Sequence, residues 1–232
     1  MSLQVWPVTG IGEVKSGDDL ATILAGAIGP LRPASDDVLV VTHKIVSKAE
    51  GRVVPIEGDE DHFKRMLVEG EAASVMRRRG DLIIAETRHG FVCANAGVDR
   101  SNAEPGTMIL LPADPDRSAH TIRIRIERQL GIGLGVIISD TFGRPWRRGL
   151  TDVAIGVSGL DALIDLRGTR DWMGRELEVT EIAAADELAA AADLVMGKAS
   201  GVPAALIRGY DGPRGDGRGQ DLVRPVDEDL FR

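Results

Sequence analysis

The chain has 232 residues, a formal net charge of -8 and an isoelectric point near 5.1. Hydrophobic residues make up 43% of the sequence, enough to build a core at this size without a metal or a disulfide to hold it together. An acidic chain of this kind lacks the basic footprint that most nucleic-acid readers carry, so nucleic acid is not an expected partner.

The sequence also indicates a compartment. Cys93 is the single cysteine, which excludes an intramolecular disulfide and favours a reducing cytoplasm. The first residues lack the basic and apolar regions of a signal peptide, and no apolar run approaches the roughly 20 residues that span a bilayer. We therefore expect a soluble, cytoplasmic protein with no membrane partner.

The first two predicted elements are a helix and a strand. Residues 17–29 place apolar side chains on one helical face and acidic residues in the first turn. Residues 38–41 are too few and too β-branched for a helix and predict a buried strand. That strand would deliver polar side chains at its end: Thr42, His43, Lys44 and Lys48. Lysine is a frequent partner of phosphate, but a solvated charged face explains the same residues equally well.

Residues 59–80 predict a helix interrupted near Gly70. Residues 81–102 predict a strand, a turn at His89 and Gly90, a second short strand and a polar loop. This loop contains an aspartate and an asparagine, for which ordinary turn chemistry is the favoured reading when the loop is considered alone.

Residues 113–131 fit two patterns, since their isoleucines alternate as in a strand while their apolar residues also follow a helical face. Pro115 suits the first turn of a helix and Gly131 its end, so we predict a helix.

The last elements follow at short intervals. Residues 135–140 and 152–160 predict strands, 180–198 predict an alanine-rich helix capped by Thr180, and 203–210 predict a final strand. Helices and strands mix without strict βαβ alternation, which indicates an α+β fold with mixed sheets and packed helices.

Several familiar site patterns are absent from the sequence. It has no P-loop, and the glycines of 131–135 precede a strand instead of opening a helix, so the Rossmann scheme is not expected either. The four histidines show no zinc-like spacing, and no G-x-S-x-G elbow is present. Zinc enzymes and serine hydrolases are therefore disfavoured.

The stretch "IISDTFGRPWRRG" places Asp140 and Thr141 directly after a strand, followed by Arg144, Arg147 and Arg148. A carboxylate at a strand end is well placed to bind a hard cation, and the arginines suit an anion, so a phosphate and its metal could share the site. The alternative is a capped loop whose arginines pair with surface acids. We favour the functional reading by a small margin.

Three motifs, "VSKAEGR" (46–52), "ANAGVDRSN" (94–102) and "SDTFGRPWRRGLTDVAIGVSGL" (139–160), resemble the coenzyme F420:L-glutamate ligase family. The resemblance extends over nearly the whole chain. It implies a family-specific fold of two packed subdomains over residues 1–210, with residues 211–232 as a glycine- and charge-rich tail or linker. The ending "RPVDEDLFR" resembles the point at which a two-domain form continues into a nitroreductase domain, so either a stand-alone ligase or an N-terminal half is expected.

The resemblance implies a GTP-dependent ligase that joins L-glutamate to the F420 precursor, and in many members then adds further γ-linked glutamates. It also implies a homodimer that uses Mg²⁺ or Mn²⁺ together with K⁺. Two alternatives remain open: a ligase that joins another acid to another amino acid, and a nucleotide-binding module that performs no chemistry.

The resemblance also assigns roles to individual residues. Asp99 and Asp140 correspond to carboxylate ligands of a metal, Thr141 to a ligand of a second metal, and Lys48 joins the two aspartates as a catalytic candidate. The nucleotide contacts it implies are Ile11, Gly12, Glu13, Val14, His43, Lys44, Lys48, Asn102, Met196, Gly197, Lys198, Ala199, Ser200, Gly201, Val202 and Pro203. Two positions depart from the family: His43 stands where members often have serine, and Lys198 where some have glutamine or an acidic metal ligand. A lysine there would repel a metal.

Overall fold

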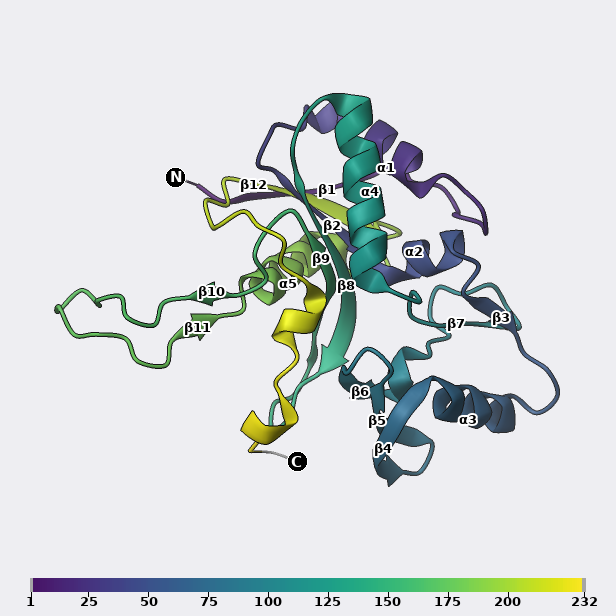
Figure 1. Cartoon of the computed structure of the whole chain (residues 1–232). Coiled ribbons are helices and arrows are strands. Elements are labelled where there is room, and N and C mark those ends of the chain that lie inside the picture. The colour runs from purple at the N-terminus through teal and green to yellow at the C-terminus, as the bar shows by residue number, and fades with distance from the viewer. Residues whose placement is uncertain (1, 231–232) are drawn as a thin grey trace.

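The computed structural model describes residues 2–230 and is built around a five-stranded sheet (Figure 1). The strand order is β1 (Gln4–Pro7), β12 (Ala204–Arg208), β2 (Val38–Thr42), β8 (Gly135–Gly143) and β9 (Leu150–Ser158). Strands β2 and β8 pair in parallel, and the other neighbours pair antiparallel. This mixed sheet, with helices packed on it, confirms the predicted α+β class.

Helices cover both faces of the sheet. Helices α1 (Leu20–Ile28) and α4 (Pro115–Leu130) pack on one face, and α5 (Ala184–Met196) packs on the other. The residues of β2 therefore alternate between two cores, with Leu39 and Val41 facing α1 and α4, and Val38 and Val40 facing α5. A strand buried on both faces reads as a continuous apolar run, which explains why 38–41 predicted a buried strand.

Helix α4 confirms the prediction for residues 113–131. The carboxylate of Asp114 accepts a hydrogen bond from the backbone N–H of Arg117 at 3.0 Å, and Pro115 occupies the first turn. Gly131 ends the helix with a left-handed φ of +69°, a conformation that favours glycine because it has no Cβ. Helix α1 begins later than expected, so Asp19 caps it from outside and its first turn holds no acidic residue.

The helix predicted for residues 59–80 is wrong in its second half. Helix α3 (Glu60–Glu71) ends one residue after Gly70, and β4 (Ala72–Arg79) follows as the edge of a small sheet with β5 (Leu82–Thr87) and β6 (Val92–Ala94). The helical pattern of apolar residues predicted for 59–80 does not hold through 72–79. These residues form a strand because they pair with β5, and such tertiary contacts override a weak local preference for helix.

Two further predictions need correction. Residues His43–Ala49 form a short helix, α2, so the polar side chains expected at the end of β2 lie on a helical turn instead. Helix α5 begins at Ala184 and not at Thr180, because Glu181–Ile182 form strand β11 and pair with β10 (Ile164–Asp165). The chain between β10 and β11 extends away from the body as an arm (Figure 1).

A second apolar core lies beside the main sheet. It contains Val68 of α3, Ile83 of β5, Met108 and Leu110, and it sits where β3 (Val53–Pro55) pairs with β7 (Thr107–Ile109). The polar loop that follows β6 runs along this core, and an isolated bridge between Asp99 and Ile109 fixes its backbone. The second core thus positions one side of the candidate site.

Residues 211–230 are irregular apart from two short 3-10 turns at Gly219–Leu222 and Val226–Glu228. They nevertheless pack against the domain. Gly219 is buried, and a Cβ at this position would come within 2.4 Å of the carbonyl oxygen of Ile155 on β9. Residues 231–232 lie outside the described part of the chain. Across residues 2–230, no helix combines the length and the apolar character needed to cross a membrane.

Candidate functional site

The topology of the main sheet brings one set of loops together. Strands β1, β2 and β8 all end at the edge of the sheet where β12 begins. Strand β12 runs antiparallel to both β1 and β2, and β8 runs parallel to β2. The backbone N–H of Thr42 donates to the carbonyl of Pro203 at 2.9 Å, which joins the end of β2 to the loop after α5. Strand ends of this kind form the ligand crevice of many open sheets.

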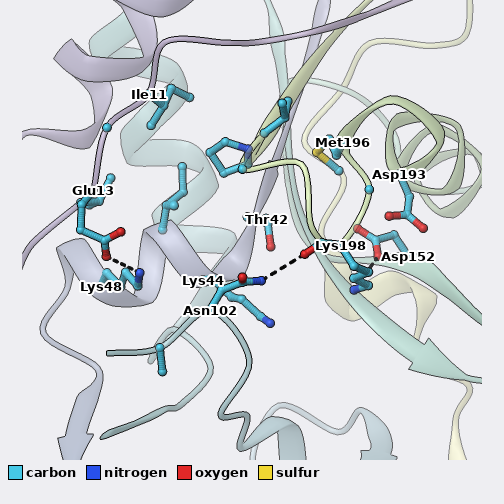
Figure 2. A pocket seen from close by; sticks show the side chains of 18 of the residues that line it. Ile11, Glu13, Thr42, Lys44, Lys48, Asn102, Asp152, Asp193, Met196 and Lys198 are labelled. Carbon is cyan, nitrogen blue, oxygen red and sulfur yellow. Dashed lines mark hydrogen bonds and ion pairs between the residues drawn. The ribbon is translucent and has the colours of Figure 1, made fainter. Parts of the chain in front are cut away.

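A cavity of about 570 Å³ opens at this edge (Figure 2). It is lined by the loop after β1, the start of α2, the polar loop at 102–104 and the end of α5 with its following loop. The lining residues are Ile11, Gly12, Glu13, Val14, Thr42, Lys44, Ile45, Lys48, Asn102, Ala103, Glu104, Asp152, Asp193, Met196, Gly197, Lys198, Gly201, Val202 and Pro203.

Lys44 and Lys48 lie one turn apart on α2 and both reach the cavity (Figure 2). Lys48 donates a hydrogen bond to Glu13, whose side chain is more than half exposed while the lysine is nearly buried. The two ammonium groups bring positive charge to the cavity, but each is paired with a carboxylate, Lys48 with Glu13 and Lys44 with Asp99. An anion that binds there competes with these carboxylates for the lysines.

Lys44 also binds the carboxylate of Asp99 from the cavity side. Its ammonium lies 2.7 Å from Asp99 Oδ2 and donates to Ser101 as well. Burial by itself would raise the pKa of Asp99, but the hydrogen bonds from Lys44 and Ser101 outweigh it and lower the pKa to about 2. Asp99 is therefore an anion at neutral pH, held directly behind the wall of the cavity.

His43 turns away from the cavity. It is completely buried, and its Nε2 lies 3.3 Å from Asp140 Oδ1, while Nδ1 faces the hydroxyl of Ser47 at 3.4 Å. Cys93 lies close by, where burial and then the charge of Asp140 raise the thiol pKa to about 12. The side chain expected to contact a nucleotide at position 43 instead packs behind the proposed metal ligand.

Thr141 and Asp140 are adjacent on β8, so their side chains point to opposite faces of the sheet. Asp140 faces His43, whereas Thr141 pairs across the sheet with Asp152 of β9 and donates a hydrogen bond to its carboxylate. Ser139 also donates to Asp152, at 2.8 Å. The two residues proposed as neighbouring metal ligands therefore have separate surroundings.

The loop after α5 closes the other side of the cavity. Lys198 donates a hydrogen bond to Thr141, and its ammonium lies 3.8 Å from Asp152 Oδ1. Its backbone carbonyl accepts from Asn102 Nδ2 at 3.5 Å, which links this loop to the polar loop across the cavity (Figure 2). Ser200 does not line the cavity but binds the carbonyl of Met196 and so shapes the loop.

The structure thus gathers most of the expected nucleotide contacts around one cavity. Three of the expected nucleotide contacts lie outside its lining: His43, Ala199 and Ser200. The three expected metal ligands, Asp99, Asp140 and Thr141, also lie outside it, and Thr141 is hydrogen-bonded to the lining residue Lys198. The roles assigned to all these residues remain predictions.

The arginines at 144–148 do not join the cavity. Arg144, Arg147 and Arg148 lie on the exposed loop between β8 and β9, and Arg144 donates to the carbonyl of Arg148 at 3.3 Å. This placement separates the arginines from the cavity and does not support the prediction that they bind an anion at the site, while the hydrogen bond of Arg144 stays within its own loop.

Sequence reasoning missed Asp152 and Asp193, which both line the cavity. Asp152 gave no signal, since its pairing with Thr141 depends on strand register. Asp193 did give one: it lies in the last turn of α5, where the negative end of the helix dipole disfavours a carboxylate.

The oxygen ligands at Asp99 and Asp140 suit a hard divalent cation such as Mg²⁺ or Mn²⁺ in chemical type. Within residues 2–230, however, no group of three or more histidine, cysteine or acidic side chains is arranged to hold a metal. The two aspartates are instead linked through adjacent residues of α2, with Asp99 on Lys44 and Asp140 beside His43. A metal at this place would take its remaining ligands from substrate phosphates and water.

Comparison with known proteins gives a consistent picture. Residues 10–209 match the model of the family described as F420-0:gamma-glutamyl ligase. A coenzyme F420:L-glutamate ligase of Methanopyrus kandleri is 44% identical over 100% of this chain and 98% of its own length. Enzymes with the same name from Methanothermobacter thermautotrophicus and Archaeoglobus fulgidus are 44% and 40% identical, over 100% of this chain and 100% and 97% of their own lengths.

Proposed function

The chain belongs to the F420-0:gamma-glutamyl ligase family, and from this premise we propose that it uses GTP to join L-glutamate to the F420 precursor through an acyl phosphate. The relatives named above carry the activity in their names; GTP dependence and the intermediate are part of the proposal. The observation that supports it best is the cavity at the strand ends, where a wall that carries Lys44 and Lys48 meets an apolar one.

The two walls suit the two parts of a nucleotide. Lys44 and Lys48 offer ammonium groups to the anionic phosphates, as lysines commonly do. Ile11, Met196 and Val202 offer apolar surface to a flat base. Asn102 lies between these walls and anchors the loop that carries Lys198. This arrangement agrees with the absence of a P-loop, since side chains replace the glycine-rich cradle.

The chemistry needs an activated carboxylate, because an unmodified carboxylate would have to expel oxide. In the first step a carboxylate oxygen of the precursor bonds to the γ-phosphorus of GTP and the bond to GDP breaks. In the second step the α-amine of glutamate bonds to the acyl carbon, and phosphate departs with the electron pair of the broken C–O bond. The protons that the amine loses pass to solvent. Lys44 and Lys48 hold the phosphates in place during both steps.

Asp99 and Asp140 would hold Mg²⁺ or Mn²⁺, which when bound would offset the charge of the phosphates. K⁺ as a further cation and assembly as a homodimer belong to the same proposal, and both are expectations from the family resemblance. Asp99 and Lys44 act as a pair in this scheme: the ammonium orients the carboxylate and stays available to a phosphate on its other side.

The test is a reaction with defined products. Purified protein is incubated with GTP, Mn²⁺, L-glutamate and the F420 precursor, and the products are followed by mass spectrometry. We expect a product heavier by one glutamyl residue, with one GDP and one phosphate released for each bond formed. GTP binding without turnover would support the nucleotide-binding module instead, and turnover with a different acid would support the related ligase.

A further inference from the structure

The end of α5 and the end of the β8–β9 pair form a cluster of oxygen-bearing side chains with one ammonium group among them. Thr141 donates to Asp152, and Lys198 donates to Thr141. The Lys198 ammonium also lies 3.8 Å from Asp152 Oδ1. Asp193, one turn before Lys198, lines the same part of the cavity (Figure 2).

Both carboxylates lie near this ammonium. The Asp152 side chain is only 5% exposed and accepts hydrogen bonds from Ser139 and Thr141. Asp193 lies at the negative end of α5, where a carboxylate is disfavoured. Burial and then the charge of Asp152 raise the pKa of Asp193, and the charge of Lys198 opposes that rise.

A second metal ion does not fit beside this ammonium. The Thr141 hydroxyl uses its proton for Asp152 and accepts a hydrogen bond from Lys198, so it is already engaged on both sides. A divalent ion on Thr141 would have a neutral hydroxyl as its ligand and the Lys198 ammonium beside it, whereas an ion at Asp99 and Asp140 would face two carboxylates. The second metal that the family resemblance implied at Thr141 therefore disagrees with the residues of this chain.

We propose that the ammonium of Lys198 takes the place of a second divalent metal ion at Thr141, Asp152 and Asp193. The inference rests on the proposed function in one respect, namely that the cavity receives the phosphates of GTP. Lys198 then presents a positive charge from the wall opposite Lys48. A tethered ammonium makes that charge independent of the supply of divalent metal, whereas a bound ion would leave when the metal is removed.

The test counts bound Mn²⁺ per chain by electron paramagnetic resonance, because free Mn²⁺ gives a signal that is lost on binding. Lys198→Gln is expected to bind one Mn²⁺ more than the wild type, through the carboxylates that the ammonium has vacated. Lys198→Gln combined with Asp193→Asn is expected to lose that additional ion. Lys198→Arg keeps the positive charge and is the matched control, with the wild-type count expected.

Two results would overturn the inference. One is that folded Lys198→Gln binds the same number of Mn²⁺ ions as the wild type. The other is that the single variant Asp193→Asn binds one Mn²⁺ fewer than the wild type. The second measurement decides the question even if Lys198→Gln fails to fold, as judged by circular dichroism. The inference is tested by differences between variants in the number of bound Mn²⁺ ions, whereas the proposed function is tested by whether the wild type forms product. The failure of one is therefore distinguishable from the failure of the other.

Discussion

The ammonium of Lys44 lies 2.7 Å from Oδ2 of Asp99, and Lys44 lines the cavity whereas Asp99 does not. One side chain therefore joins the cavity to the proposed metal ligand beside it. In the proposed function, Lys44 is the position where substrate binding and the electrostatics of Asp99 are coupled.

Replacing Lys44 by glutamine should lower turnover by about 10²-fold, since removal of one preorganised donor from a reacting charge has effects of this order. The side chain of glutamine is too short to bridge Asp99 and a phosphate. Rates of GDP release would be compared with those of Lys64→Gln, which removes a lysine of α3 outside the cavity lining. Equal rates in the two variants would contradict the role given to Lys44.

The stability of the metal-free protein should depend on pH through Asp99. Its pKa is lowered to about 2 in the folded protein from 3.8 in the reference state, so the folded protein favours the ionised form. That contribution is fully present above about pH 5 and is lost progressively as the pH falls through the folded pKa of about 2. Scanning calorimetry should show that the Tm of the wild type falls as the pH is lowered over this range, and that the Tm of Asp99→Asn falls less steeply. Parallel curves for the two proteins would argue against an ionised, hydrogen-bonded Asp99.

Glu13 binds the ammonium of Lys48, so in the proposed function it competes with a phosphate for that group. Glu13→Gln should therefore tighten GTP binding several-fold, because it frees the lysine and removes a negative charge from the edge of the cavity. Lys48→Gln should weaken binding by about tenfold, which corresponds to about 1.4 kcal/mol. Isothermal titration calorimetry of both variants provides the measurement. A shift in the same direction for both would contradict an anion site at Lys48.

Asp140→Asn should abolish most of the turnover while the fold is retained, because the amide keeps the size of the carboxylate but not its charge. We expect a loss of about 10²-fold or more, together with weaker Mn²⁺ binding. Asp186→Asn on α5 is the control: Asp186 is a half-buried carboxylate that accepts a hydrogen bond from the backbone of Ala154 and takes no part in the cavity. Near-normal activity of Asp140→Asn would remove Asp140 from the proposed metal site.

Gly156 on β9 allows α4 to pack closely on the sheet. A Cβ there would come within 2.4 Å of the carbonyl oxygen of Pro115, so Gly156→Ala should lower the free energy of unfolding by about 1–3 kcal/mol. Gly70→Ala within α3 meets no atom within 4 Å and should be neutral or stabilising by about 0.5–1 kcal/mol. Urea denaturation of both variants separates the effect of packing from the effect of losing a glycine.

The sequence by itself determined the elements whose signals are local. The buried strand at 38–41 and the helix between Pro115 and Gly131 lie where they were predicted. A strand buried on both faces is a continuous apolar run, and helix ends favour particular residues, so both are recognisable from a few adjacent residues. The long motifs also led to the family, which the match over residues 10–209 confirms.

Only the tertiary structure decided which side chains meet. The pairing of Thr141 with Asp152 depends on strand register, and the separation of Asp140 from Thr141 depends on which face of the sheet each one occupies. Lys198 reaches both Thr141 and Asp152 from a loop about fifty residues further along the chain. Contacts between segments so distant in sequence are set by packing of the whole sheet and leave no local pattern, which is why the cluster around Lys198 became visible only in the folded chain.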